Sequence, residues 1–256
     1  MSILEKVQTG VKINPPRIAI HGIDGIGKST FGAAAPRPIF LCSERGADHL
    51  GAARISITSW PDLIAACSAL YHDEHQYATV VLDSVDWFEG QLQAHVTAEA
   101  GVDSIEKVGG GYGKGHIAMA EKFRELIGWL DALNTKRRMC VIVIAHSVVK
   151  TYDDPTIGSY DRFTMKLDKR IGPMLAEWAD YLFFYSYDVS LKTEGQGFKE
   201  KSRGVSYGHR YMHTQRTPAY DAKRRWNIPD RVLIEPASPW GSFWSEHNTA
   251  LKQAAS

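Results

Sequence analysis

The sequence has little cysteine, no long apolar run and almost no net charge. Its three cysteines, Cys42, Cys67 and Cys140, are widely spaced within apolar segments, so we expect reduced thiols in a core rather than a disulfide framework. No apolar run approaches the roughly 18 residues of a membrane span, and the amino terminus lacks the apolar stretch of a secretory signal. We therefore expect a soluble cytoplasmic protein without a membrane partner.

Charge is balanced over the whole chain but not along it. Thirty Lys and Arg oppose 29 Asp and Glu, a net charge of +1, so the overall field does not indicate a polyanionic partner. Residues 192–231 contain ten basic and four acidic residues, which gives this segment a local charge of +6. Any surface for nucleic acid must therefore be local.

Short apolar runs alternate with helical patterns over the first 190 residues, which predicts a mainly parallel sheet flanked by crossover helices. Runs such as Val141 to Ile144 are apolar throughout, as in strands that are covered on both faces. The predicted strands are residues 17–21, 38–42, 53–57, 79–83, 139–145 and 181–187. The predicted helices are residues 28–35, 61–71, 85–100 and 116–135.

Two connections and the carboxyl-terminal part lie outside this pattern. Residues 109–115 are rich in glycine, and the polar residues 147–170 show no clear period, so both are expected to be loops. A β-hairpin is expected around Gly208 and His209, between strands at 205–207 and 210–213, with a last strand at 232–235. The predicted organisation is an arm at 1–16, a core at 17–191, and a basic hairpin with an extension at 192–256 that packs on the core.

A phosphate-binding motif provides the first functional signal. Residues 22–29 match G-x-x-x-x-G-K-[ST] in full, between a predicted strand and a predicted helix. In such a loop, backbone N–H groups surround the phosphates, Lys28 reaches the β and γ oxygens, and the Ser29 hydroxyl binds magnesium. The sequence therefore predicts a site for ATP and Mg²⁺. Its expected nucleotide-binding residues are Gly22, Ile23, Asp24, Gly25, Ile26, Gly27, Lys28, Ser29 and Thr30.

Three polar side chains follow other predicted strands, whose carboxyl ends should share an edge of the sheet with this loop. Asp83 ends the run Thr-Val-Val-Leu-Asp and can hold magnesium, or cap the following helix, or do both. Glu44 can activate the attacking water, and its alternative is a solvated residue near a turn. His146 can sense the γ-phosphate, and its alternative is a hydrogen-bonded buried histidine.

The phosphate loop alone resembles that of thymidylate kinases, and Asp161-Arg162-Phe163 is similar to their Asp-Arg-Tyr signature. In those kinases the Asp-Arg pair directly follows a core strand, whereas here it lies within a polar connection. The set formed by residues 40–44, 80–85 and 142–146 instead resembles, in order and position, the RecA-like ATPase core. His146 stands where that family usually has Gln, and an imidazole can donate the same hydrogen bond.

More narrowly, the chain resembles phage-encoded ATP-binding single-strand annealing proteins, which have a minimal RecA-like core. The supporting features are the glycine-rich residues 109–115, His146, and residues 217–225 near the end of the core. The resemblance implies that Glu44 is the catalytic base, Asp83 the magnesium acid and His146 the sensor. It also implies self-association into rings or filaments, in which Lys223 and Arg225 are candidates to reach the ATP of a neighbouring subunit.

The two predicted loops are candidates for binding single-stranded DNA. Aromatic residues are interleaved with basic ones in both, and stacking with backbone neutralisation holds single strands without sequence preference. Two mobile solvated loops are the alternative, because Asp153, Asp154, Asp161 and Asp168 oppose the basic charge of the second. The candidate contacts are Lys107, Tyr112, Lys114, Lys150, Arg162, Lys166, Lys169 and Arg170.

The sequence thus predicts an α/β protein, a RecA-like P-loop NTPase with a carboxyl-terminal hairpin extension. The expected function is DNA-dependent ATP hydrolysis coupled to single-strand annealing or recombination, in a bacterial host if the chain is phage-encoded, with a single-strand-binding protein as a candidate partner. One alternative is a DNA-binding module in which ATP is a slow conformational switch. The other is a nucleotide kinase of thymidylate type.

Overall fold

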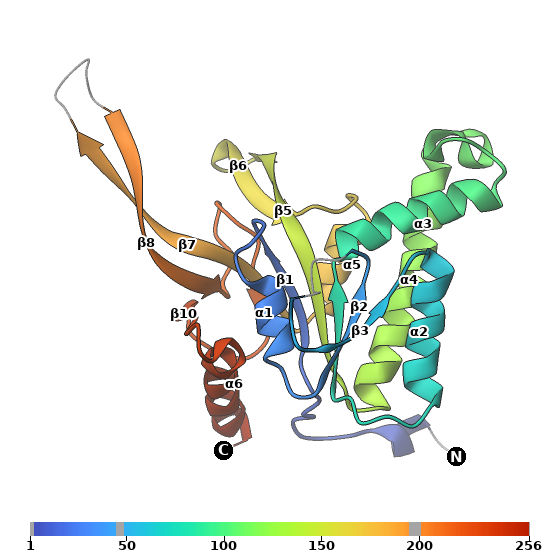
Figure 1. Ribbon diagram of the computed structural model, residues 1–256, viewed down its shortest axis with the longest axis horizontal. Coiled ribbons are helices and arrows are strands. Elements are labelled where there is room, and N and C mark those ends of the chain that lie inside the picture. Colours follow the sequence, from blue (N-terminus) through green and yellow to red (C-terminus); the bar gives the residue numbers. More distant parts are fainter. Residues whose placement is uncertain (1–2, 45–48, 195–200, 256) are drawn as a thin grey trace.

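A computed structural model describes residues 3–44, 49–194 and 201–255 (Figure 1). The strands are β1 (Arg17–Gly22), β2 (Pro38–Cys42), β3 (Ala53–Ser56), β4 (Thr79–Asp83), β5 (Cys140–Asp154), β6 (Gly158–Met165), β7 (Tyr181–Glu194), β8 (Lys201–His213), β9 (Lys223–Arg224) and β10 (Arg231–Leu233). The helices are η1 (Ile3–Lys6), α1 (Lys28–Ala33), α2 (Trp60–His72), α3 (Val85–Glu99), η3 (Ile105–Gly110), α4 (Lys114–Thr135), α5 (Ile171–Trp178) and α6 (Pro239–Ala255).

Ten strands form one connected sheet with the order β10-β8-β7-β1-β5-β4-β2-β3, and β6 and β9 pair at its sides. The pairs from β3 through β7 are all parallel, whereas β6, β8, β9 and β10 pair antiparallel with their neighbours. This confirms the predicted α/β fold, with a mostly parallel central sheet flanked by helices. The phosphate strand β1 and the strand of Asp83, β4, are separated by β5, which carries His146.

Helices cover both faces of the sheet, which explains the apolar strands. In β4, Val80 and Leu82 pack into one core with α2, α3, α4 and α5, whereas Val81 packs into a second core with α1 and α6. Phe243 of α6 is fully buried in this second core. Each fully buried side chain of this size contributes about 1.5 to 3 kcal/mol, so both helix layers hold the sheet in place.

The six strands predicted for the first 190 residues are all present, but two of them are much longer than expected. β5 continues past Ala145 to Asp154 and pairs antiparallel with β6, so residues 147–165 form a β-hairpin that the sequence analysis wrongly predicted as a loop. Cross-strand partners such as Lys150 with Arg162 and Tyr152 with Tyr160 show that this hairpin is polar on much of its surface. A polar hairpin lacks the apolar alternation by which strands are found in a sequence.

The hairpin predicted around Gly208 and His209 is also wrong, because both residues lie within the single strand β8. Its partner is β7, and the residues that join the two strands, 195–200, lie outside the described residues. Gly208 has a φ of +79° at a point where the pairing shifts between Tyr187 and Val189. This is a β-bulge, and the glycine that suggested a turn provides its left-handed backbone instead. The expected boundary between residues 191 and 192 falls inside β7.

Further differences concern helices. α5 and α6 were not predicted, and the glycine-rich residues 109–115 form the end of η3 and the beginning of α4 rather than one loop. The three cysteines are free and buried, as expected. Within the described residues, no helix is both long and apolar enough to cross a membrane.

Candidate functional site

The phosphate-binding motif lies at the carboxyl end of β1 and leads directly into α1. Gly27 is the residue before α1 and has a φ of +104°, a left-handed conformation that favours glycine. A Cβ added to Gly22 would lie 2.8 Å from the backbone oxygen of Tyr185 on β7. The loop therefore follows a strand that is closely packed against its neighbour and leads into the amino-terminal end of a helix, where backbone N–H groups bind anions.

Lys28 is buried inside this loop, with a relative exposure of 6%. Its Nζ donates hydrogen bonds to the backbone oxygens of Gly22 (2.8 Å) and Ile23 (2.9 Å). Burial lowers the pKa of Lys28, and the nearby carboxylates of Asp24 and Asp83 oppose that shift. The ammonium group is thus held at the loop, where phosphate oxygens would offer it a stronger partner than neutral carbonyls.

Asp83 and Ser29 meet as the motif predicted. The Ser29 hydroxyl donates a 2.6 Å hydrogen bond to Oδ2 of Asp83, across 54 residues of sequence. Burial raises the pKa of Asp83, although the hydrogen bond from Ser29 and the charge of Lys28 lower it. A hydroxyl and a carboxylate oxygen at this distance are ligands of the kind that Mg²⁺ prefers, so these residues fit a magnesium site beside the phosphates.

Glu44 follows β2 and is exposed. Partial burial raises the pKa of its carboxyl group, His146 opposes this, and Asp83, Asp86 and Asp24 raise it further. Glu44 therefore lies in the same electrostatic environment as the phosphate loop and the magnesium acid. The residues directly after it, 45–48, are outside the described part of the chain.

His146 is held by two carboxylates, and one of them, that of Asp86, was not predicted from the sequence. Its Nδ1 donates to Oδ2 of Asp86 at 2.8 Å, and its backbone N–H donates to Oδ1 of Asp86 at 3.1 Å. Its Nε2 lies 3.2 Å from Oδ1 of Asp24 in the phosphate loop. The hydrogen bond with Asp86 is the main cause that raises the pKa of His146, against partial burial. Asp86 lies in the first turn of α3, three residues after Asp83, and that spacing was the available signal.

Two other residues contact the loop or its strand without having been predicted. Arg210 of β8 donates to the backbone oxygen of Ile26 at 3.3 Å. His21 of β1 is fully buried, with Nδ1 2.9 Å from the Ser147 hydroxyl and Nε2 2.8 Å from the backbone oxygen of Asp221. A carbonyl only accepts, so Nε2 carries the proton and Nδ1 accepts from Ser147. Burial lowers the pKa of His21 to about 4, so the imidazole is neutral at pH 7.

The predicted DNA-binding residues divide between two places. Lys107 forms an ion pair with Asp103, the Lys114 ammonium donates to the backbone oxygen of Gly109, and Tyr112 is 99% exposed. On or near the β5/β6 hairpin, Lys150, Lys166 and Lys169 are exposed and Arg170 is half-buried.

Arg162 differs from the other basic residues of this group because it is only 5% exposed. Its guanidinium donates to Pro218 O, to Asp221 and to the Tyr160 hydroxyl. It lies on β6, an antiparallel hairpin strand, rather than directly after a core strand as in the kinase signature. Arg162 therefore stabilises the hairpin and the segment beside it.

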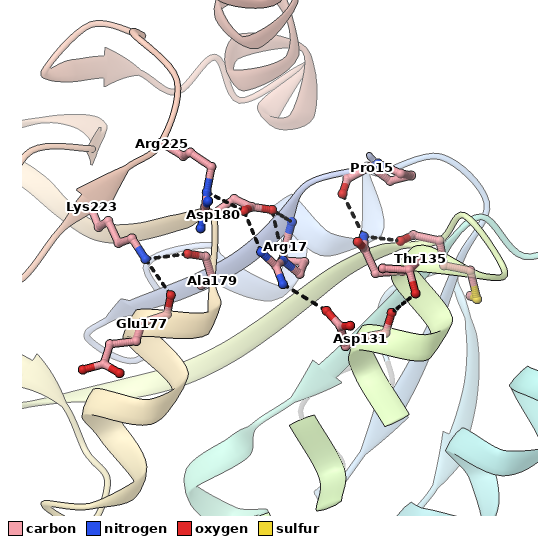
Figure 2. A network of polar contacts seen from close by, with 11 residues as sticks. Pro15, Arg17, Asp131, Thr135, Glu177, Ala179, Asp180, Lys223 and Arg225 are labelled. Atoms are coloured by element: carbon pink, nitrogen blue, oxygen red, sulfur yellow. Dashed lines mark hydrogen bonds and ion pairs between the residues drawn. The ribbon is translucent and has the colours of Figure 1, made fainter. Parts of the chain in front are cut away.

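The two candidates for action on a neighbouring subunit are engaged within the chain (Figure 2). Lys223 Nζ donates to the backbone oxygens of Ala176, Glu177 and Ala179 at 2.8 to 2.9 Å, at the carboxyl end of α5. Arg225 pairs with Asp180 at 2.8 Å, and Asp180 also pairs with Arg17 at 2.9 Å. These contacts leave the Arg225 side chain half exposed, and Lys223 acts as a cap of α5.

Comparison with protein families matches an AAA domain over residues 14–226, from before β1 to beyond β9. The chain belongs to the AAA domain family. Membership of this family supports a nucleotide-binding ATPase. The matched range contains every candidate site residue described above. A solved structure of the RadB recombinase is similar with 14% identity and a TM-score of 0.45, over 88% of this chain and 90% of that one. Comparison with curated proteins finds no match.

Proposed function

We propose that the protein binds single-stranded DNA and uses magnesium-dependent ATP hydrolysis to promote annealing or recombination. The observation that carries the proposal is the position of His146. It lies on β5 just before the β5/β6 hairpin, and its imidazole contacts both Asp24 of the phosphate loop and Asp86 of α3. A change at the γ-phosphate can therefore reach the β5/β6 hairpin, and Lys166 and Lys169 that follow it, through one side chain.

The same residues support hydrolysis. Lys28 would exchange its two carbonyl partners for β and γ oxygens, and Ser29 and Asp83 would hold Mg²⁺, which neutralises phosphate charge. Glu44 would accept a proton from the water that attacks the γ-phosphorus, while the bond from that phosphorus to the bridging oxygen breaks and ADP is the leaving group. Its raised pKa makes Glu44 a stronger base than an ordinary glutamate. His146 would donate a hydrogen bond to the γ-phosphate from Nε2.

The DNA-binding surface in this proposal comprises the segment from η3 to α4 and the β5/β6 hairpin. The hairpin directly follows His146 of the nucleotide site, and Figure 1 shows it rising from the edge of the sheet at which the loop after β1 also lies. Exposed Lys150, Lys166 and Lys169 can neutralise phosphates, and exposed Tyr112 can stack on a base. Self-association into rings or filaments and a single-strand-binding protein as partner belong to the same proposal.

The decisive experiment measures phosphate release from ATP and Mg²⁺ with and without single-stranded DNA. We expect strong stimulation by DNA, loss of all activity in Lys28→Ala, and no change in Lys136→Ala, which removes an exposed lysine at the far end of α4. Activity that depends on Lys28 but ignores DNA would overturn the DNA-binding part of the proposal. Phosphate transfer to a nucleoside monophosphate would instead establish a kinase.

The variant Glu44→Gln distinguishes whether annealing requires ATP hydrolysis or only ATP binding. If annealing is lost together with hydrolysis, turnover drives it. If annealing persists while hydrolysis is slow, ATP acts as a conformational ligand of a binding module.

A further inference from the structure

A cavity of about 700 Å³ lies apart from the nucleotide site. Its walls come from the β5/β6 hairpin, from α5, and from the segment between Arg216 and Lys223. None of its lining residues belongs to the phosphate loop or to the group of Glu44, Asp83 and His146. Its volume lies within the range of sites that enclose small organic ligands, which is about 300 to 1,000 Å³.

The floor of this cavity is apolar. Met165 and Leu167, which are 7% and 6% exposed, lie beside Leu182 of β7 and Ala176 of α5. Apolar walls favour a ligand that has a flat or compact apolar part, because removing that part from water is favourable.

Its rim is positively charged. The lining includes five basic side chains and three acidic ones. Asp221 already has cationic partners in Arg162 and Arg216, and Asp168 lies 3.1 Å from Nδ1 of His116. Lys169 and Arg216 are exposed or half exposed at the rim. The rim therefore complements an anion.

Tyr152 gives the cavity a planar wall, and Arg162 supports it from behind. The Arg162 donors are directed to Pro218 O, Asp221 and Tyr160, so its polar edge is occupied. Its Cζ lies 4.6 Å from the centre of the Tyr152 ring and 5.2 Å from that of Tyr160, whereas Tyr152 itself is 44% exposed. Tyrosine rings are surfaces on which unpaired bases stack. An apolar floor, a planar wall and a cationic rim together suit a nucleotide unit, which has a flat base and an attached phosphate.

We propose that this cavity receives one unstacked base of a bound single strand, with the adjoining phosphate at Lys169 and Arg216. The proposal rests on the single-strand binding proposed above and names the site that takes the base. It also connects the strand with the nucleotide site, because the backbone oxygen of Asp221 in the cavity wall binds His21, one residue before the phosphate loop.

The test compares oligothymidylate with a strand of equal length in which abasic sites replace the bases. Both strands keep their phosphates, so only the base contribution differs. Binding to the full chain with ATP and Mg²⁺ would be followed by fluorescence anisotropy at several salt concentrations. We expect the wild type to bind the intact strand about 10-fold or more tightly than the abasic strand, since one stacked base contributes about 1 to 3 kcal/mol.

Variants that fill the cavity locate the effect. Ala176→Trp, from α5, and Thr164→Trp, from β6, should lower the preference for the intact strand about 10-fold, by the contribution of one stacked base. Both should leave affinity for the abasic strand, its salt dependence and basal phosphate release unchanged. Ala98→Trp adds the same ring at an exposed position of α3 and should keep the full preference. Two filling variants on different elements guard against a fold defect in either, which thermal unfolding would reveal.

Equal affinity of the wild type for both strands, with normal salt dependence, would overturn the base site and leave single-strand binding intact. Full preference in both folded filling variants would also overturn it. Absence of salt-sensitive binding to either strand would overturn the base site together with the proposed function.

Discussion

Nδ1 of His146 lies 2.8 Å from Oδ2 of Asp86, and the two residues are separated by 60 positions in the sequence. The Asp86 side chain is 4% exposed and that of His146 is 23% exposed, so the pair is shielded from solvent. Asp86 thereby fixes the ring orientation and leaves Nε2 directed at Asp24 of the phosphate loop. The pair gives the sensor histidine a fixed direction, and Asp86 acts as its positioning residue.

Asp86→Asn should lower the pKa of His146 toward 6.5 and reduce stability by about 1 to 3 kcal/mol. Burial raises the pKa of Asp86, but hydrogen bonds and the charge of His146 lower it overall, and Asp86 in turn raises that of His146. The contribution of Asp86 to folding stability is present above its unfolded pKa and is lost as pH falls through its lower folded pKa. That of His146 is present below its unfolded pKa and is lost as pH rises through the higher folded value.

The stability difference between wild type and Asp86→Asn should therefore be largest between these two limits and shrink at both extremes. Denaturant unfolding between pH 3 and pH 9 and an NMR titration of the His146 ring measure it. A difference that stays constant across this range would contradict the ion pair.

Glu44→Gln should lower phosphate release by about 10² to 10⁴-fold while ATP binding remains, because the amide cannot accept the proton of the attacking water. The carboxylate form is the active one, and the pKa of Glu44 is raised. Wild-type activity should thus fall, as pH decreases, at a higher pH than for an ordinary glutamate. Single-turnover rates as a function of pH check this. Retention of normal rates in Glu44→Gln would assign the base elsewhere.

Replacing Lys166 and Lys169 together by alanine should weaken binding to single strands of every sequence. Each lysine that neutralises a phosphate contributes about 0.7 to the slope of log K against log salt for a single strand, so the slope should fall by about 1.4. Anisotropy titrations at four salt concentrations provide the value. Lys136→Ala is the matched control, and an unchanged slope in the double variant would remove the segment after the hairpin from the DNA surface.

Lys223→Met should destabilise the protein by about 1 to 2 kcal/mol, because three backbone oxygens at the end of α5 lose their donor. Thermal unfolding measures this loss. If Lys223 instead acted on the ATP of a neighbouring subunit, Lys223→Met would reduce ATP hydrolysis at high protein concentration without changing stability. That second result would place Lys223 at a subunit interface.

Acid should destabilise the fold partly through buried histidines. Burial lowers the pKa values of His21, His213 and His247 to about 4. In the unfolded chain these rings take up protons near pH 6.5, whereas in the folded chain they remain neutral until about pH 4. Stability should consequently decrease as pH falls from 6.5 to 4. Titration of the ring signals by NMR would show whether these three histidines stay neutral at pH 5.5.

Local patterns in the sequence were sufficient to predict the phosphate loop, the parallel strands and the meeting of Ser29 with Asp83. The loop is a contiguous motif whose glycines and lysine act within eight residues, and apolar runs identify strands that are buried on both faces. Parallel strands also end at one edge of a sheet, so polar residues after them could be assigned to one site in advance. Glu44 and His146 stay predictions as catalytic residues, although the structure places them beside Asp83.

The other features of the site could not be predicted, because their contacts join distant segments that carry no local signal. Arg210 reaches the phosphate loop across 184 positions, and His21 reaches Asp221 across 200. The β5/β6 hairpin and the bulge at Gly208 are stabilised by pairing with strands that are not identifiable as partners from the sequence. Without apolar alternation, neither could be predicted. Packing of the whole sheet brings distant segments together. It thereby creates the contact of His146 with Asp86, the cap on α5 and the cavity behind the hairpin.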